Sequence, residues 1–277
     1  MTENSTFFLS SDGTKLHTES WKIINPKAVI ALVHGFGEHI GRYAHFAKFF
    51  NTEGFAVQGI DVRGHGKSDG RRGHTPNYDI ILDDLDIFLA SVKNNNPNLP
   101  VFLYGHSMGG AIVLNYVTKR KSKLAGVIAS APLIHLSFKA NPVTLFFGKQ
   151  LRKLIPTFTQ KGGVIADNIS RDKEVVAKYQ VDPLVHNKVS AEMGLALIEN
   201  GEKLNQFSGK MPVPLLIMHG TGDKLTSFSA SEEFSKRVSG DITFKKYDVL
   251  YHELHNEPEK MEVFKDVLSW MNSKLKV

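Results

Sequence analysis

One stretch near the middle of the chain decides the fold: Val101-Phe102-Leu103-Tyr104-Gly105-His106-Ser107-Met108-Gly109-Gly110-Ala111-Ile112-Val113-Leu114. Its apolar beginning is typical of a buried strand, its apolar end is typical of a helix, and the motif G-x-S-x-G lies between them. A turn this tight holds Ser107 in a strained conformation with its hydroxyl exposed, and the flanking glycines avoid collisions that a Cβ would cause. Free N–H groups at the start of the helix favour the anion formed when a serine attacks a carbonyl. We therefore predict that Ser107 is a nucleophile rather than part of a plain tight turn.

Length and composition fit a globular protein with a large core. The chain has 277 residues, of which 42% are hydrophobic and 22% charged, and its net charge is +6. Because cysteine is absent, a disulfide framework, a thiolate zinc site and a cysteine nucleophile are excluded. The positive charge suits an anionic lipid surface, whereas nucleic acid is the competing interpretation. The basic cluster 119–121 is short and lacks interleaved aromatic residues, so we expect no nucleic-acid partner.

The N-terminus is polar and is not followed by the apolar segment of a secretory signal. No apolar run reaches the about 18 residues that a membrane span needs. We therefore expect a cytoplasmic protein whose contact with membranes, if any, is peripheral.

Strand and helix patterns alternate along most of the chain. Strands are predicted over 6–10, 15–21, 28–33, 56–60, 101–104, 126–130, 213–218 and 242–247, and helices over 42–52, 78–93, 229–238 and 259–274, besides the helix that follows Ser107. This alternation predicts an α/β fold with a mostly parallel central sheet and helices on both faces. The region 133–211 breaks the alternation because it has no convincing strand. We expect a core formed by 1–132 and 212–277, with 133–211 inserted as a helical cap (lid).

The serine needs a base, and the base needs a carboxylate that holds its tautomer. In the Ser…Asp…His order of the α/β-hydrolase fold, the acid follows a late strand and the histidine a later one. Asp223 lies in a glycine-rich loop after the strand 213–218, at the edge where such sheets bind ligands. His252 and His255 are the only histidines downstream, and either could be the base. We prefer His252 because it is nearer to the end of the strand 242–247.

The oxyanion needs fixed donors. We predict that they are the backbone N–H groups of Met108, which follows the nucleophile, and of Phe36 in the glycine-bearing loop after strand 28–33. The side chains of both residues are expected to be walls of the acyl pocket. The sequence 252–255 resembles the zinc motif H-E-x-x-H but is one residue short, so we predict no metal and no cofactor.

At this point the sequence resembles the monoacylglycerol lipase family of α/β-hydrolases, which are also described as lysophospholipase-like. The resemblance is carried by the stretches 34–43, 64–70, 105–111, 170–171, 179–184 and 251–255 and by the Asp223 loop, which are spread over nearly the whole chain.

The resemblance implies a serine hydrolase that releases a fatty acid from a monoacylglycerol, with Ser107, Asp223 and His252 as its triad. It also implies a polar pocket for the glycerol head, whose members map onto Glu38, Arg42, Tyr179 and His255. The four-residue spacing of Glu38 and Arg42 also fits a surface ion pair that contributes little. Phe36 departs from the family, which often has a small residue at this position.

The cap composition suits a lipid substrate. Its apolar residues are Phe138, Leu145, Phe146, Phe147, Leu151, Leu154, Ile155 and Phe158, and they are mixed with the basic residues Lys139, Lys149, Arg152, Lys153 and Lys161. An apolar face with a basic rim can lie on a membrane and admit an amphiphile. The alternative is a helix whose apolar face only covers the core.

The same triad would also serve a lysophospholipase, a broad carboxylesterase or an aminopeptidase-like hydrolase. For an aminopeptidase we find no acidic cluster that would hold the substrate amine. A non-catalytic binding protein on this fold is the alternative from another class, but such proteins usually lose a member of the triad. We therefore expect a monoacylglycerol or another single-chain lipid ester as substrate.

Overall fold

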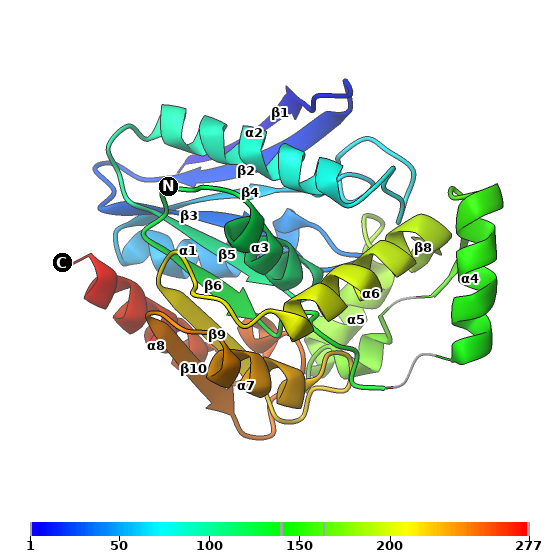
Figure 1. Ribbon diagram of the computed structural model, residues 1–277. Helices are drawn as coiled ribbons and strands as arrows, with labels where there is room; N and C mark the ends of the chain where they lie inside the picture. The colour runs from blue at the N-terminus through cyan, green and yellow to red at the C-terminus, as the bar shows by residue number, and fades with distance from the viewer. Residues whose placement is uncertain (1, 139–140, 163, 276–277) are drawn as a thin grey trace.

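The computed structural model describes residues 2–138, 141–162 and 164–275, which are arranged around one eight-stranded sheet (Figure 1). Along the sheet the strand order is β1-β2-β4-β3-β5-β6-β9-β10. The strands are β1 (Thr2–Leu9), β2 (Lys15–Lys22), β3 (Ala28–Val33), β4 (Phe55–Ile60), β5 (Val101–His106), β6 (Gly126–Ser130), β9 (Leu215–Gly220) and β10 (Ile242–Tyr247). From β4 to β10 all neighbours are parallel, and β2 runs antiparallel to both β1 and β4. The carboxyl ends of the parallel strands therefore meet at one edge of the sheet.

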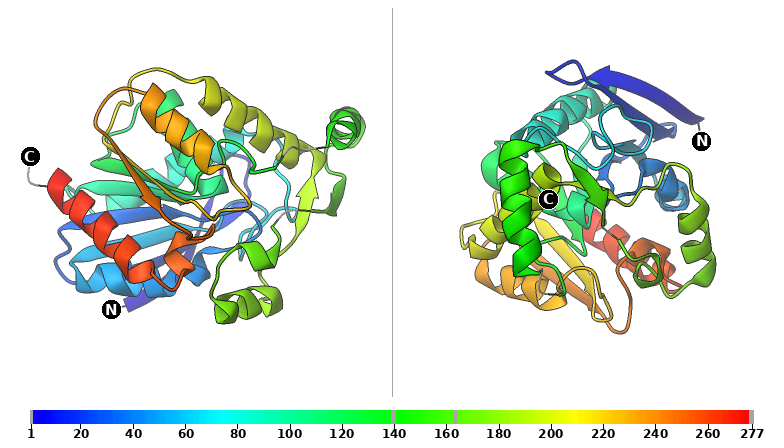
Figure 2. Two further views of the ribbon diagram at one scale, coloured as in Figure 1. Left: turned by 90° about the horizontal axis from the view of Figure 1, so that it is seen from below. Right: turned by 90° about the vertical axis from the view of Figure 1, so that its right-hand side faces the viewer.

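Helices cover both faces of the sheet because its central strands are apolar on both sides. Every residue of β3, β4, β5, β6 and β9 is buried. One face packs on α1 (Ala44–Thr52) and α8 (Lys260–Lys274) through a core that includes Phe46, Phe50 and Phe264. The other face packs on α2 (Asp79–Asn95), α3 (Met108–Lys119) and α7 (Phe228–Arg237). Figure 2 shows these layers from two further directions.

The region 133–211 contains α4 (Pro142–Leu154), β7 (Thr159–Lys161), a 3-10 turn (Ala166–Asn168), α5 (Lys173–Val181), β8 (Lys188–Ser190) and α6 (Ala191–Gln206). None of its described strands joins the large sheet, since β7 and β8 pair only with each other. The expectation that this region has no strand is wrong for these three-residue pieces. They are too short to show the alternation by which strands are recognised.

The helix α4 lies at one side of the molecule, away from the sheet (Figures 1 and 2). All thirteen of its residues are described and none is buried. Among the described elements it packs mainly on α6. Arg152 of α4 reaches Glu192 and Glu199 of α6 with hydrogen bonds of 2.7 Å. Of the predicted basic residues of the cap, Lys139 lies outside the described residues.

The predicted α/β fold, with a mostly parallel central sheet and helices on both faces, is confirmed, and most element bounds differ from the prediction by at most two residues. The strands β5 and β9 run further than predicted, to His106 and Gly220, because their last residues still pair with neighbouring strands. In the described part of the chain, no helix combines the length and the apolar character that crossing a membrane requires.

Candidate active site

Ser107 stands in the turn between β5 and α3, at the carboxyl edge of the sheet. Its backbone has φ 55° and ψ −114°, a conformation that residues other than glycine rarely adopt. A Cβ on Gly105 would lie 2.3 Å from the carbonyl oxygen of Gly109, and one on Gly109 would lie 2.2 Å from that of Val33. Both glycines are therefore required by the close packing of α3 on the strands, as the sequence predicted.

The N–H of Met108 is available at this turn. The first helical hydrogen bond runs from the N–H of Ala111 to the carbonyl oxygen of Ser107, so Met108 belongs to the first turn, whose N–H groups lack helical acceptors. The side chain of Met108 is fully buried in the core, and it is not among the described residues that line the cavity at Ser107. The expectation that this side chain is a wall of the acyl pocket is therefore wrong.

Asp223 and His252 meet at the same edge. Asp223 follows β9 and His252 follows β10, and Oδ2 of Asp223 lies 2.7 Å from Nδ1 of His252. Oδ1 of Asp223 accepts the backbone N–H groups of Leu225 and Thr226 at 2.7 and 3.0 Å, which fixes the carboxylate. Because an ionised carboxylate only accepts hydrogen bonds, His252 carries its proton on Nδ1 and leaves the lone pair of Nε2 free. This is the tautomer that a general base needs.

The charges of this pair support each other. Burial by itself raises the pKa of Asp223, but the charge of His252 and the hydrogen bonds from His219 and His252 outweigh burial and hold that pKa well below its ordinary value. Burial lowers the pKa of His252, but the charge of Asp223 and the hydrogen bond to it outweigh burial and raise that pKa above 6.5. An imidazolium at His252 is thereby stabilised.

Ser107 and His252 line one cavity of about 210 Å³. Its other walls come from the loop after β3, from the segment between β9 and α7, and mainly from the region 133–211. They are Phe36, Leu133, Leu136, Phe138, Val164, Val189, Gly194, Leu197, Ile198, Leu225 and Thr226. The predicted role of the Phe36 side chain as a wall fits this position. A nucleophile and an imidazole in the wall of a mainly apolar cavity suit a substrate with a hydrocarbon chain.

The loop after β3, residues 34–39, lies against the nucleophile, and we call it the oxyanion loop. A Cβ on Gly35 would lie 3.3 Å from Cβ of Ser107 and 2.9 Å from Oε1 of Glu38. The N–H of Gly35 donates to that Glu38 oxygen at 2.7 Å. Nδ1 of His34 donates to the carbonyl oxygen of Gly35, and its Nε2 accepts the N–H of Val62 at 2.9 Å. His34 therefore shapes the loop, because both of its ring nitrogens are hydrogen-bonded to backbone groups.

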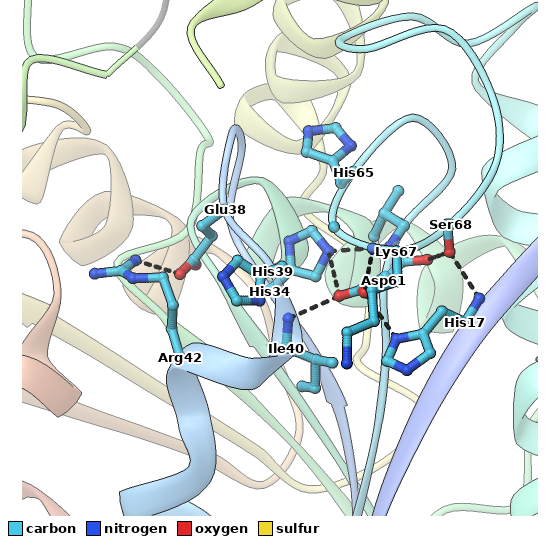
Figure 3. A network of polar contacts seen from close by, with 12 residues as sticks. His17, His34, Glu38, His39, Ile40, Arg42, Asp61, His65, Lys67 and Ser68 are labelled. Carbon is cyan, nitrogen blue, oxygen red and sulfur yellow. Dashed lines mark hydrogen bonds and ion pairs between the residues drawn. The ribbon is translucent and has the colours of Figure 1, made fainter. Parts of the chain in front are cut away.

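Asp61 anchors this loop through hydrogen bonds to several segments (Figure 3). Its Oδ1 accepts the N–H of Ile40 at 2.8 Å, and its Oδ2 accepts the N–H of Lys67 and Nδ1 of His17, both at 2.8 Å. Burial alone would raise the pKa of Asp61, but the hydrogen bond from His17 and its other polar neighbours lower the pKa to about 2. One carboxylate thus joins the segments that follow β3 and β4 to the strand β2.

Arg42 joins the oxyanion loop to the loop of His252. Its Nη1 reaches Glu38 and also Oε1 of Glu253 at 2.6 Å, and its Nη2 reaches Oε2 of Glu253 at 2.7 Å. The side chains of Arg42 and Glu38 are only 9% and 3% exposed, so the alternative of a surface ion pair is wrong. A buried pair of this kind tolerates the loss of one partner poorly. Because Glu253 is the neighbour of His252 in sequence, the ion pair of Arg42 with Glu253 belongs to the active site.

The four residues of the predicted glycerol pocket lie close together. Tyr179 of α5 lies under Arg42, whose guanidinium carbon is 4.7 Å from the ring centroid. His255 stacks on Tyr43, which donates to Glu38, with ring centroids 4.4 Å apart. Among the described residues, none of these four lines the cavity at Ser107, and no hydrogen-bond partner is found for either ring nitrogen of His255. Their role toward glycerol stays a prediction.

One grouping of possible metal ligands lies here. Glu38, His106 and Glu253 each offer a ligand atom, and these atoms lie within 4.8 Å of one another. The guanidinium of Arg42 pairs with both carboxylates and is already their cationic partner, so the geometry assigns no ion to them. Burial lowers the pKa of His106 to about 3, which keeps its imidazole neutral beside His252.

The region 133–211 is fastened to both catalytic loops. The N–H of Glu253 donates to the carbonyl oxygen of Ile169 at 2.8 Å, and Glu257 accepts from Ser170 at 2.8 Å. On the oxyanion side, the N–H of His186 donates to the carbonyl oxygen of Gly37 at 2.9 Å. Sequence reasoning missed these contacts, along with Asp61, Glu253 and His219, because hydrogen bonds between distant segments leave no local pattern.

The sequence matches the profile of the serine aminopeptidase S33 family (Hydrolase_4) over residues 24–259. It is 37% identical to the monoacylglycerol lipase of Mycolicibacterium smegmatis over 97% of this chain and 96% of that one. It is 36% identical to an uncharacterized abhydrolase domain-containing protein of Dictyostelium discoideum over 99% of this chain, which spans only 30% of that relative's length. Among solved structures, a soluble variant of the monoglyceride lipase from Saccharomyces cerevisiae, in complex with a substrate analog, superposes with a TM-score of 0.86 at 28% identity, covering 97% of this chain and 94% of that one. The predicted α/β-hydrolase fold is confirmed.

Proposed function

We propose that this chain, which belongs to the serine aminopeptidase S33 family and within it to the monoacylglycerol lipases, cleaves monoacylglycerol into fatty acid and glycerol. Membership makes it a carboxylic-ester hydrolase. The observation that carries the proposal is a serine on a strained turn that shares an apolar cavity with a histidine bound to a buried aspartate. The chemistry of this site needs no metal.

In the proposed reaction, Oγ of Ser107 attacks the ester carbonyl carbon while Nε2 of His252 takes the hydroxyl proton. Asp223 stabilises the imidazolium through the Nδ1 hydrogen bond of 2.7 Å. The N–H groups of Phe36 and Met108 hold the oxyanion. The intermediate then expels the glycerol oxygen, which receives the proton from His252. Water, deprotonated by His252, attacks the acyl-serine, and collapse of that second intermediate releases the fatty acid and restores Ser107.

The proposed acyl site is the cavity at Ser107, and a second cavity extends it. The second cavity measures about 430 Å³ and shares Leu133, Leu136, Phe138, Leu197 and Ile198 with the first. The first cavity alone, at about 210 Å³, is smaller than the about 300–1,000 Å³ of usual ligand sites. We propose that long acyl chains reach into the second cavity past these shared side chains.

The glycerol head is proposed to lie toward the Arg42 side of Ser107. The support is the position of Glu38, whose carboxylate lies directly behind Gly35 and hence beside the nucleophile. If Tyr179 contributes to this site, Tyr179→Phe raises KM for a monoacylglycerol and leaves KM for the methyl ester of the same fatty acid unchanged. Equal changes for both esters would argue against a headgroup role.

Contact with a membrane is proposed for α4. Val143, Phe146 and Phe147 are each about 60% exposed on this helix, and Leu154 is 78% exposed. Lys149 and Lys153 lie exposed on the same helix, whereas Arg152 is engaged by the acids of α6. We propose that 133–211 is the cap that takes lipid from the surface and delivers it to Ser107.

The deciding experiment measures fatty-acid release from a monoacylglycerol by the wild type, by Ser107→Ala and by Ser91→Ala. Ser91, which is half-buried on α2, controls for loss of a serine hydroxyl away from the site. We expect release to stop in Ser107→Ala only, with unchanged thermal unfolding. Assays with lysophosphatidylcholine and a short p-nitrophenyl ester run in parallel, and a preference for either one replaces the proposed substrate. Full activity of Ser107→Ala overturns the proposal.

A further inference from the structure

A second imidazole, that of His219, is hydrogen-bonded to the carboxylate of Asp223. Nε2 of His219 lies 3.0 Å from Oδ2 of Asp223, the same oxygen that accepts from Nδ1 of His252. Both imidazoles and the carboxylate are almost completely buried, with side-chain exposures of 0%, 3% and 0% for His219, His252 and Asp223. The reaction described above uses one imidazole on this carboxylate, so the second needs its own explanation.

The hydrogen-bond partners fix the tautomer of His219. An ionised Asp223 can only accept, so Nε2 of His219 carries the proton and donates it. Nδ1 is then an acceptor, and it lies 2.8 Å from Oγ of the fully buried Ser231 on α7, whose hydroxyl donates to it. In this hydrogen-bond series Ser231 donates to His219, and His219 donates to the carboxylate of Asp223. His252 donates to the same carboxylate from the other side.

This geometry makes the two imidazoles compete for one oxygen. A carboxylate oxygen that already accepts a hydrogen bond has less negative charge to offer a second donor, and inside a protein this coupling is strong. The hydroxyl of Thr226 also donates to this oxygen, at 2.8 Å, and lies 3.1 Å from the carbonyl oxygen of Ala131. The Nε2 proton of His219 is likewise near a second acceptor, the carbonyl oxygen of Thr226 at 3.3 Å. Among the described residues, His219 is the imidazole that competes with His252 for this oxygen.

We propose that His219 is a positioning residue that holds the carboxylate of Asp223 and weakens the basicity of His252, so that the catalytic base is free of its proton at a lower pH. This inference rests on the proposed function, since it assigns His252 as the base. It adds a fourth side chain to the triad and a fifth, Ser231, that fixes the orientation of the fourth.

The other titratable groups near the pair are accounted for. From β5, the ring of His106 lies 4.7 Å from that of His252, and Glu38 and Glu253 lie beyond it. From β10, Lys246 is paired in register with His219, but its amine lies 3.4 Å from Asp248 at the surface. From α7, the ring facing His219 is Phe228, which carries no charge. Among the described residues, His219 and His252 are thus the two histidines whose rings contact Asp223 directly.

The test is the pH dependence of kcat/KM for a soluble p-nitrophenyl ester, because its acid limb reports the ionisation of the base in the free enzyme. His219→Leu removes the donor, and we expect the limb to move up by about half to one pH unit. Activity on the acid side then falls by about three- to tenfold relative to the wild type. His219→Gln keeps an N–H near the position of Nε2, and we expect its limb to coincide with that of the wild type.

Ser231→Ala provides a second, milder probe that acts only through His219. It frees Nδ1, weakens the Nε2 donor and moves the limb in the same direction by a smaller amount. If His219→Leu does not fold, the limb of Ser231→Ala decides. Unmoved limbs in the folded variants overturn the inference, even where the wild type is fully active. Loss of the proposed function is a separate result, since it shows as activity in Ser107→Ala or as no labelling of Ser107 by a fluorophosphonate.

Discussion

At the scale of single residues, the site depends on buried carboxylates that sit among backbone N–H groups. Asp61 serves three segments at once, and each of its partners is a donor. Such an acceptor cannot be replaced by a group of similar shape that also donates, because one donor then faces another.

The first prediction follows for Asp61→Asn. The amide loses the charge and turns an N–H toward donors, so we expect the free energy of unfolding to fall by about 2–4 kcal/mol. We also expect kcat to fall while KM for a soluble ester changes little, because the oxyanion loop loses its anchor at Ile40. Urea unfolding and steady-state kinetics measure both effects. Asp12→Asn is the control, since Asp12 is 33% exposed in the β1–β2 turn, and equal losses in the two variants would contradict the prediction.

The functional role of a residue could be predicted from the sequence where a local motif indicates it. The G-x-S-x-G turn, the loop of Asp223 and the glycines of the oxyanion loop each follow a strand within a few residues. His219 and Glu253 were not readable, because their partners come from other segments. Glu38 and Arg42 were correctly paired by their spacing, but their burial depends on Glu253, which is 211 residues from Arg42 in sequence.

At the scale of elements, two glycines in helices give a matched comparison. A Cβ on Gly109 of α3 would lie 2.2 Å from a backbone oxygen, whereas one on Gly148 of α4 would meet nothing within 4 Å. We predict that Gly109→Ala destabilises the protein by at least about 2 kcal/mol. Gly148→Ala stabilises it by about 0.5–1 kcal/mol through helix propensity. Thermal unfolding distinguishes them, and similar effects in both variants would refute the packing argument.

The exposed face of α4 leads to another prediction. The double variant Phe146→Ser with Phe147→Ser should weaken binding to anionic vesicles by at least about tenfold, because each buried phenylalanine contributes about 1.5–3 kcal/mol. Hydrolysis of a soluble ester should not change. Ile24→Ser is the control, because Ile24 is 90% exposed but precedes β3, at the edge of the sheet opposite Ser107. Vesicle sedimentation measures both, and equal losses would show that α4 has no special role.

Strands were predictable where a short run of strand-forming residues lies between clear turn signals. The bounds of β3, β6 and β10 match the prediction residue for residue, since each is a short run with turn signals at both ends. The strands β7 and β8 were not predicted, because three residues are too few to show the alternation of apolar and polar residues. The prediction that 133–211 forms a separate cap stays open. The segments before and after α5 are hydrogen-bonded to the two catalytic loops, whereas α4 packs mainly on α6.

At the scale of the whole molecule, stability should depend on pH through buried histidines. Burial lowers the pKa of His65 and His255 well below 6.5, and that of His106 to about 3. The unfolded chain binds protons at these positions once the pH falls below about 6.5, whereas the folded protein does not. Their contribution is therefore complete above that pH and is lost below it, by about 1.4 kcal/mol per pH unit for each imidazole.

His252 acts in the opposite direction, because its pKa is raised in the fold. Its stabilising contribution is complete below about pH 6.5 and disappears above the folded-state pKa, so it changes at a higher pH than the contributions of the other three imidazoles. We predict a steep fall of the unfolding free energy between about pH 6.5 and about pH 5, measured by urea unfolding. His65→Asn keeps a donor for the carbonyl oxygen of Arg63 and should reduce the slope. A flat profile for the wild type would exclude this account.

The backbone conformation of Ser107 lowers the thermal stability of the protein at the position where catalysis needs a serine. A residue with a side chain at φ 55° and ψ −114° is held at a cost of about 1–3 kcal/mol, which glycine avoids. Ser107→Gly should therefore melt at a higher temperature than the wild type while turning over no ester. Selection for thermal stability alone would favour replacement of the nucleophile by glycine. A directed-evolution experiment for more stable variants therefore has to screen for activity at every round.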